Sequence, residues 1–330
     1  GISMDYGNLL KRAWHIVWNN KFMFVLGFLA ALGSGGNGGN GGARGNFNVS
    51  GSSSDFNLPP GFAENIERYW AQYAGITIAL VCLAIILGIV FWLVSLVGQA
   101  GLISAASRID SGEQVTLGDA FGAGTGALVR MIGLNLILYG PFILLGLIFF
   151  GIASVTVGSA VASEFAGNPS NFETIFSGIG PFFACFGILA CVMVPLGLIV
   201  TVIYPFAQRG LILQELGIVD SIRHGWNVIR DNIGDVFLLI LLFVVIGFVF
   251  GIAAAVVLLP AAALAFLPTI VDLVRGGTLE IGNIAFMIGG GICLGLLGAV
   301  INSIMIAFRS TTVTLAYQEF INKTNKLKAA

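Results

Sequence analysis

Charged residues are scarce in this sequence. Asp, Glu, Lys and Arg together account for 9% of its 330 residues, whereas a soluble domain carries about 25%. Hydrophobic residues reach 57%, and the mean hydropathy is +0.96. The net charge of -1 creates no bulk attraction for nucleic acid, so no nucleic-acid partner is expected. The composition excludes an ordinary soluble domain and indicates an integral membrane protein, with membrane lipid as a partner.

Residue types that build catalytic and metal sites are equally few. The two histidines, His15 and His224, fall on polar faces of predicted helices, where we expect them to be solvated. The sequence has no GxSxG, HExxH or phosphate-loop motif and no carboxylate pair within a predicted span. All four cysteines lie in apolar runs without metal-ligand spacing, and we interpret them as small buried hydrophobic residues: Cys82, Cys185, Cys191 and Cys293. We therefore predict no catalytic residue, metal site or cofactor, and expect that the chain is not an enzyme.

One segment is present three times along the chain. The copies are Tyr6–Gly33, Leu117–Gly146 and Leu216–Gly247, and each runs from an amphipathic part into an apolar part. A shift of 212 positions superposes the first copy on the third, with Lys11 on Arg223, Trp14 on Trp226 and Asn20 on Asn232. A shift of 101 positions superposes Asp119 of the second copy on Asp220. An internal repeat of this kind determines how the whole fold is interpreted.

The amphipathic parts predict three helices at the membrane surface. They cover Leu9–Asn19, Leu117–Leu128 and Val219–Arg230, and each is expected to turn into the span that follows. Glycine disfavours helix by roughly 1 kcal/mol relative to alanine. We therefore expect the middle helix to fray or kink at its three glycines, Gly122, Gly124 and Gly126.

The predicted fold class is an all-α integral membrane protein with six transmembrane helices, built as three tandem repeats of an amphipathic helix plus two spans. The repeats are placed at residues 4–116, 117–215 and 216–330, after a cloning remnant at residues 1–3. Residues 33–60 are rich in Gly, Asn and Ser and are expected to form an extracytoplasmic loop without helix or strand. Because every unit enters the membrane from the same side, we expect a pseudo-threefold arrangement about the membrane normal.

Three spans depart from a simple hydrophobic helix. The first apolar run, Phe22–Leu32, would cover only roughly 17 Å of a core about 30 Å thick. Its helix therefore either starts earlier, near Ile16, or forms a partial span sheltered by neighbours. The third span is expected to break at Gly140-Pro141, and the fifth to end near Pro260 or Pro268.

Basic residues are distributed unevenly between the two predicted sides of the membrane. Only three, Arg44, Arg68 and Arg275, fall on one side, and the other twelve fall on the opposite side. Loops rich in Lys and Arg stay in the cytoplasm. The sequence therefore predicts a multi-pass protein of the plasma membrane with both termini in the cytoplasm.

Four arginines near the predicted cytoplasmic surface are candidate contacts for lipid headgroups: Arg209, Arg223, Arg230 and Arg309. Arg209 and Arg309 share one repeat position at the end of a span. They can anchor the protein by snorkelling, or they can recognise an anionic headgroup between repeats. Two amides within spans, Asn135 and Asn302, can bond neighbouring helices or line a substrate or ion path.

Two stretches resemble a broad group of prokaryotic multispan membrane proteins. They are YPFAQRGLILQELGIVDSIRHGWNVIRDNIGDVFLLILL, which begins at Tyr204, and NLLKRAWHIVWNNKFMFVLGFLAAL, which begins at Asn8. The group includes the membrane domain that precedes the catalytic barrel in some glycerophosphoryl diester phosphodiesterases. That barrel and its His and Glu residues are absent from this sequence, so no active site can be transferred. The resemblance implies an all-helical membrane protein with an accessory or lipid-associated role.

Three functions are compatible with these features. The first is a non-enzymatic accessory or scaffold protein that engages lipid, a membrane-protein partner or a second copy of itself through its amphipathic helices. The second is a transporter or channel with a pathway between the repeats, although no charged residue marks the middle of a span. The third is an enzyme acting on lipid, for which no nucleophile or metal ligand set is visible. We favour the first.

The predicted topology can be tested with single cysteines introduced at Ser52 and Lys326. The positive-inside bias places position 52 outside the cell and position 326 in the cytoplasm. A membrane-impermeant thiol reagent added to intact cells should label only the cysteine at position 52. Labelling of both positions from the same side would contradict the topology.

Overall fold

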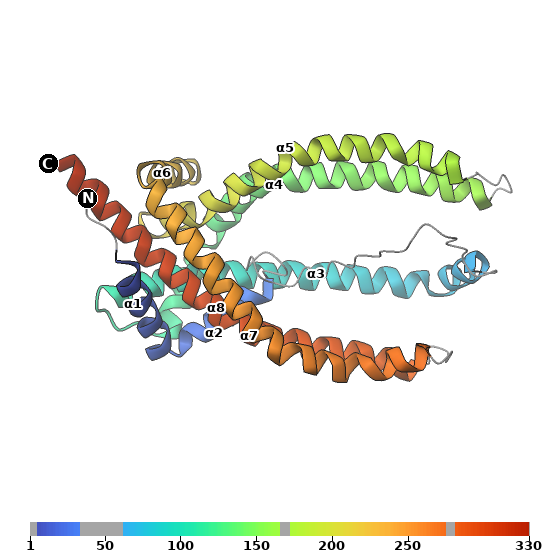
Figure 1. The fold of residues 1–330 in the computed structure, drawn as a ribbon, viewed down its shortest axis with the longest axis horizontal. Helices are drawn as coiled ribbons and strands as arrows, with labels where there is room; N and C mark the ends of the chain where they lie inside the picture. Colours follow the sequence, from blue (N-terminus) through green and yellow to red (C-terminus); the bar gives the residue numbers. More distant parts are fainter. Residues whose placement is uncertain (1–4, 34–61, 166–171, 275–280, 330) are drawn as a thin grey trace. The chain divides into compact units, whose positions relative to one another are not determined.

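The computed structural model describes residues 5–33, 62–165, 172–274 and 281–329. Within these ranges every regular element is an α-helix (Figure 1). The helices are α1 (Tyr6–Asn19), α2 (Phe22–Gly33), α3 (Phe62–Asp110), α4 (Leu117–Phe165), α5 (Phe172–Leu213), α6 (Ile218–Asp231), α7 (Ile233–Val274) and α8 (Ile281–Ala329). The predicted cloning remnant and all but the first residue of the predicted Gly-, Asn- and Ser-rich loop lie outside the described residues.

Five of these helices are long and apolar enough to cross a membrane. The qualifying parts are Ile78–Asp110, Leu117–Ile152, Leu189–Leu213, Ile233–Leu267 and Gly289–Thr324. α1 and α2 qualify only as a pair, and they bend by 97° at a short break. The described residues therefore contain five candidate spans, or six if the bent pair is counted. The all-helical class is confirmed for the described residues, and their long apolar helices are consistent with a multi-pass membrane protein.

The first span was expected either to start earlier, near Ile16, or to be a partial span sheltered by neighbours. The residue at which α2 starts decides between these two predictions. A helix that began near Ile16 would continue without interruption, but α1 ends at Asn19 and α2 begins at Phe22. The 12 residues of α2 cover only about 18 Å. α2 is therefore shorter than the hydrocarbon core of a membrane.

Two neighbouring helices, α3 and α8, shelter this short helix. The Ser95 hydroxyl of α3 donates a hydrogen bond of 2.7 Å to the Ala30 carbonyl of α2. On another face, Gly27 of α2 lies so close to α8 that a Cβ would collide with the Ser303 carbonyl. Backbone groups at membrane depth need protein partners, and α2 has them on two sides.

The helices continue through the prolines, so the break expected at Gly140-Pro141 is absent, whereas the candidate span in α7 ends at Leu267, beside Pro268 as expected. α4 continues through Pro141 to Phe165, and α7 continues through Pro260 and Pro268 to Val274. A proline removes one backbone hydrogen bond of a helix. Ending the helix in hydrocarbon would leave several more backbone groups without partners, which costs more.

The interpretation of the cysteines as buried residues was wrong where the structure describes them. Cys82, Cys191 and Cys293 are exposed on their helices; the side chain of Cys185 lies outside the described residues. An apolar sequence context is equally compatible with contact to lipid, because lipid and protein interior are both apolar. The sequence alone therefore could not separate the two environments.

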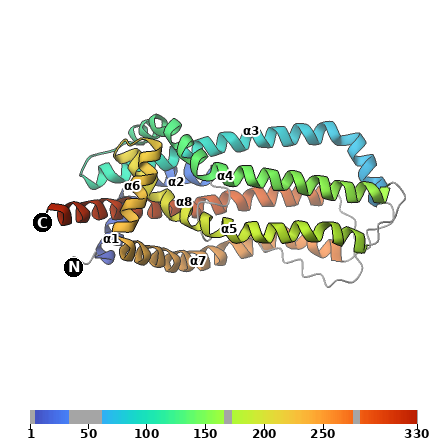
Figure 2. The same ribbon diagram turned by 90° about the horizontal axis from the view of Figure 1, so that it is seen from above.

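The chain divides into two compact units. Unit 1 comprises Gly1–Leu128 and Gly234–Leu315, and unit 2 comprises Val129–Ile233 and Ala316–Ala330. Within unit 1, α7 and α8 run side by side, and within unit 2, α4 and α5 do so (Figure 1 and Figure 2). These boundaries differ from those of the predicted repeats, which stay a prediction.

The three predicted amphipathic segments are helical and bury corresponding positions. α1 and α6 each have 14 residues, and their bounds differ by the same 212 positions as their sequences. The buried positions common to all three segments are Leu9, Ala120 and Ser221, then Ala13, Gly124 and Gly225, then Ile16, Ala127 and Val228. The same face of each segment is therefore covered by protein.

The connection to the following span differs among the three segments. α1 and α6 both end at an asparagine whose side-chain amide donates to the carbonyl four residues earlier, from Asn20 to Ile16 at 2.8 Å and from Asn232 to Val228 at 3.1 Å. The aligned residue in α4 is Met131, which has no such donor. α4 accordingly continues as helix from Leu117 into the span, and the expected fraying at its glycines does not occur.

Each amphipathic segment contacts a neighbouring long helix. At Gly124 of α4 a Cβ would collide with the Val97 carbonyl of α3, and at Gly225 of α6 a Cβ would lie 2.9 Å from the Ala207 nitrogen of α5. α1 contacts α8 through Trp14, whose ring centroid is 5.8 Å from that of Phe308. The second and third segments thus contact the long helix that precedes them in sequence, whereas the first contacts both α8 and the end of α3.

Replacement of Gly124 tests the close contact between α4 and α3. The Gly124→Ala change should destabilise the protein by about 1–3 kcal/mol, because the added methyl meets backbone that cannot move aside. Gly126→Ala is the matched control, since a Cβ there meets nothing within 4 Å and alanine is the better helix former by up to about 1 kcal/mol. Unfolding in mixed detergent micelles measures both changes. Equal stability of the two variants would contradict the contact.

Candidate functional site

α1 exposes a tryptophan pair beside a lysine. Trp14 is 48% exposed and stacks on Trp18 with ring centroids 5.1 Å apart. Trp18 also meets the edge of Phe24 in α2. Lys11 lies three residues before Trp14 and is exposed, without an ion pair among the described residues. Residues at spacings of three and four share one side of a helix, so these side chains form a continuous line.

α6 exposes the same pattern with two cations. Trp226 is 48% exposed, the same fraction as its counterpart on α1. Arg223 and Arg230 flank it at spacings of three and four, and both are exposed. Neither arginine has an ion-pair partner in the part of the chain that the structure describes. Their guanidinium groups are available to ligands outside the protein.

We use the name basic–tryptophan stripe for this pattern, which is present once in unit 1 and once in unit 2. Its members are Lys11, Trp14 and Trp18 on α1 and Arg223, Trp226 and Arg230 on α6. Tryptophan is enriched where a membrane meets water, and basic side chains attract anionic headgroups. The stripe therefore has the chemistry of a membrane-surface contact.

The other two predicted headgroup residues are withdrawn from the surface. Arg209 is only 3% exposed, and its guanidinium donates a hydrogen bond of 2.6 Å to the Pro205 carbonyl. Arg309 is half-buried, with its guanidinium carbon 5.6 Å from the ring centroid of Phe243. Arg209 lies near the end of α5 and Arg309 lies within α8, and each side chain folds back onto protein.

His224 is half-buried, so its predicted solvation was wrong, whereas His15 is exposed as predicted. The Nε2 atom of His224 lies 3.0 Å from the Tyr317 hydroxyl of α8. Desolvation lowers the pKa of His224 below its ordinary value. The charge of Arg209 is close enough to act on the same tyrosine. Unit 2 thus contains a polar cluster of three side chains from α5, α6 and α8.

The two intramembrane amides have different surroundings. Asn135 of α4 accepts a hydrogen bond of 3.1 Å from the Tyr204 hydroxyl of α5 and donates one of 2.9 Å to the Met131 carbonyl. Of the two interpretations given for Asn135, a hydrogen bond between helices or part of a substrate or ion path, the structure shows the hydrogen bond. Asn302 makes no hydrogen bond within the described residues. The choice between bonding and a pathway stays open for Asn302.

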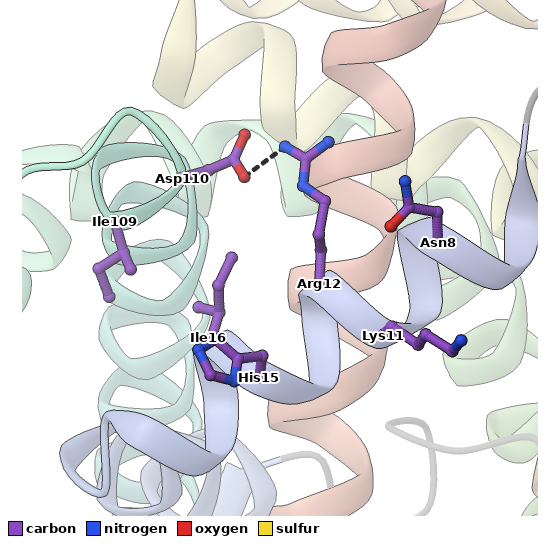
Figure 3. Close-up of a pocket in the computed structure, with 7 residues that line it drawn as sticks. All are labelled: Asn8, Lys11, Arg12, His15, Ile16, Ile109 and Asp110. Atoms are coloured by element: carbon purple, nitrogen blue, oxygen red, sulfur yellow. Dashed lines mark hydrogen bonds and ion pairs between the residues drawn. The ribbon is translucent and has the colours of Figure 1, made fainter.

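A groove lies between α1 and the end of α3 in unit 1. It has a volume of about 400 Å³, and its lining residues are Asn8, Lys11, Arg12, His15, Ile16, Ile109 and Asp110. Arg12 and Asp110 form an ion pair of 2.6 Å across it (Figure 3). Sequence reasoning missed this groove because Asp110 is 98 residues away from Arg12.

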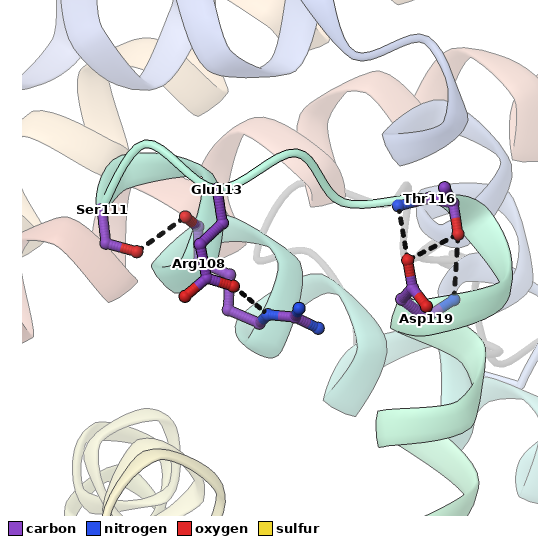
Figure 4. Close-up of polar contacts among 5 residues, drawn as sticks. All are labelled: Arg108, Ser111, Glu113, Thr116 and Asp119. Atoms are coloured by element: carbon purple, nitrogen blue, oxygen red, sulfur yellow. Dashed lines mark hydrogen bonds and ion pairs between the residues drawn. The ribbon is translucent and has the colours of Figure 1, made fainter.

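A rigid turn connects α3 to α4 beside this groove. Arg108 and Glu113 form an ion pair of 2.7 Å across the turn (Figure 4). Gly112 adopts a φ of 88°, a conformation that favours glycine after a helix end. The Thr116 backbone N–H and hydroxyl donate to the Asp119 carboxylate, and the Asp119 N–H donates back to the hydroxyl. This reciprocal cap specifies the start of α4.

Metal-ligand chemistry is not visible in the described part of the chain, where no group of three His, Cys, Asp or Glu residues could hold an ion.

Comparison with known proteins identifies one family. The profile of a family of unknown function, DUF7544, matches residues 16–321. No curated protein and no solved structure matches the chain. The resemblance to the glycerophosphoryl diester phosphodiesterase membrane domain stays a prediction.

The environment of His224 predicts a dependence of stability on pH. Its pKa is lowered in the folded protein, so the unfolded chain binds the proton first as the pH falls. Stability is therefore present above the unfolded pKa, near 6.5, and is lost as the pH drops through it. The His224→Gln variant should lose less stability than the wild type between pH 8 and pH 5, measured as the midpoint of unfolding. His15→Gln, at an exposed histidine on α1, is the control and should retain the wild-type dependence; identical slopes for all three proteins would contradict the assignment.

Proposed function

The chain belongs to the DUF7544 family, whose function is unknown, and we propose that it is a non-enzymatic accessory or scaffold protein of the membrane. It engages anionic lipid, or a membrane partner that presents the same charge, through α1 and α6. The observation that carries this proposal is the basic–tryptophan stripe. Both helices bury one face against protein and expose cations and tryptophans on another.

The physical argument is that the stripe combines two types of attraction. Tryptophan rings prefer the headgroup region of a membrane. Each Lys or Arg near an anionic leaflet contributes about 1 kcal/mol of attraction. Because α1 and α6 are held by their buried faces, the cations are presented without a further cost of ordering the backbone.

Three tandem repeats and cytoplasmic termini are part of the proposal. The shared buried positions and the order in which the amphipathic segments contact the long helices support the repeats. The twelve-to-three distribution of basic residues supports a plasma-membrane protein with both amphipathic helices on the cytoplasmic side. A homo-oligomer is compatible with this arrangement.

A transporter or channel remains the alternative, but no described feature favours it. The Asn135 amide is engaged by Tyr204 and by its own helix, which accounts for its presence within a span. No charged residue of the kind expected at a coupling-ion site lies in the middle of a span predicted from the sequence.

Anionic-lipid binding by the stripe can be measured on the purified full-length protein. Native mass spectrometry after equilibration with phosphatidylglycerol and phosphatidylcholine reports how many molecules of each lipid are retained. The Arg223→Gln/Arg230→Gln variant should bind phosphatidylglycerol about thirtyfold more weakly, since two cations at about 1 kcal/mol each contribute about 2 kcal/mol. Phosphatidylcholine binding should not change.

The matched control removes the same number of positive charges from segments that are expected on the other side of the membrane. Arg44→Gln/Arg275→Gln lowers the net charge by two and leaves the stripe intact. Its phosphatidylglycerol affinity should stay close to that of the wild type. An equal loss in both double variants would show that net charge, and not the stripe, determines lipid binding.

A further inference from the structure

We propose that the groove between α1 and α3 is a binding site for a phosphate group. This inference rests on the proposed function and deepens it, because it assigns a discrete anion site beside the more diffuse basic–tryptophan stripe. The groove lies within unit 1, and α1 and the end of α3 line it. Its polar side chains come from successive turns of one helix, and a carboxylate faces them from the other.

The first reason is the number of hydrogen-bond donors that the groove collects. Asn8, Arg12 and His15 follow one another at spacings of four and three on α1, so they share one side of the helix. In Figure 3 the side chains of Asn8 and Arg12 rise from the same side of α1, and that of Arg12 reaches Asp110 at the end of α3. An amide, a guanidinium and an imidazole can each donate a hydrogen bond to a phosphate oxygen.

The second reason is that Arg12 is held in position before a ligand arrives. Its ion pair with Asp110 measures 2.6 Å, and the Asp110 side chain is only 18% exposed while that of Arg12 is 47% exposed. The carboxylate is thus enclosed, and the guanidinium extends from it toward solvent. A guanidinium presents donors in a fixed planar geometry that suits phosphate oxygens.

The third reason is the charge of the groove. With His15 neutral, Lys11 and Arg12 contribute two positive charges and Asp110 one negative charge, which leaves +1. Lys11 points away from Asp110 and lies at the outer edge. Its flexible stem allows the ammonium group to reach an anion that enters the groove. A singly charged phosphodiester matches this balance.

The fourth reason is the mixed character of the lining. Ile16 and Ile109 add apolar surface beside the donors. A phosphate that carries a glycerol or hydrocarbon part can cover these side chains as well as reach the donors. Two sources have this chemistry, namely a phospholipid headgroup and a soluble phosphate ester, and the experiment must distinguish them.

The aligned position on α6 indicates which substitution will block the site without damaging the helix. Asn8 corresponds to Asp220, so the same place in a closely similar helix already holds a carboxylate. An acidic residue in the first turn is also favourable to the helix dipole. The Asn8→Asp change therefore preserves α1 while it lowers the charge of the groove from +1 to zero.

The test measures binding of two probes to the full-length protein in detergent, dioleoyl phosphatidylglycerol and glycerol 3-phosphate. We expect Asn8→Asp to weaken binding of the preferred probe at least fivefold. The control is Gln214→Glu, which converts an exposed amide to a carboxylate in the α5–α6 connection, outside the groove; it should leave binding unchanged.

The two probes identify the source of the phosphate. If Asn8→Asp weakens binding of phosphatidylglycerol alone, the groove binds a lipid headgroup. If it weakens binding of glycerol 3-phosphate, the groove binds a soluble phosphate ester. If neither probe distinguishes Asn8→Asp from Gln214→Glu, the groove is not a phosphate site. That result is separable from failure of the proposed function, which depends on the Arg223→Gln/Arg230→Gln variant.

Discussion

Close approach of a small residue to the backbone of a long helix is the contact on which the arrangement depends. Gly124 lies against Val97 of α3, and Gly225 lies against Ala207 of α5. α1 has Ala13 at the corresponding position, and that residue is fully buried. Apolar attraction between helices is weak in lipid, so packing at small residues supplies much of their association. The absence of a larger side chain at these positions allows an amphipathic segment to lie directly on a span.

The exposed surface follows from this contact. Once the face that contains Ala13 or Gly225 is covered, the helical period determines which residues point outward. Lys11 and Trp14 on α1, and Arg223 and Trp226 on α6, then occupy equivalent exposed positions. The residues that each helix buries thus determine which basic and tryptophan residues it exposes. The alignment of α1 with α6 shows both sets of positions.

α1 and α6 differ in the residue at one position of their polar faces. The residue at one aligned position is Arg12 on α1 and His224 on α6. Arg12 forms an ion pair with Asp110 of α3, whereas His224 meets the hydroxyl of Tyr317 in α8. The first arrangement keeps a charged groove open to solvent, and the second encloses a neutral contact. Equivalent helices therefore provide different chemistry in the two units.

The sequence by itself determined the helical class, the apolar candidate spans and the three amphipathic segments, because these depend on composition and on a local period. It also contained the signal for the two helix breaks, since Asn20 and Asn232 align and Met131 replaces them. Tertiary structure alone decided that Arg209 and Arg309 fold back onto protein, that His224 meets Tyr317, and that Arg12 meets Asp110 across a groove. Those contacts join residues up to 98 positions apart, and the burial of a polar side chain depends on which helix lies beside it. The continuity of α4 and α7 through their prolines was likewise decided by the solvent around each whole helix, since hydrocarbon penalises an exposed backbone more than it penalises one missing hydrogen bond.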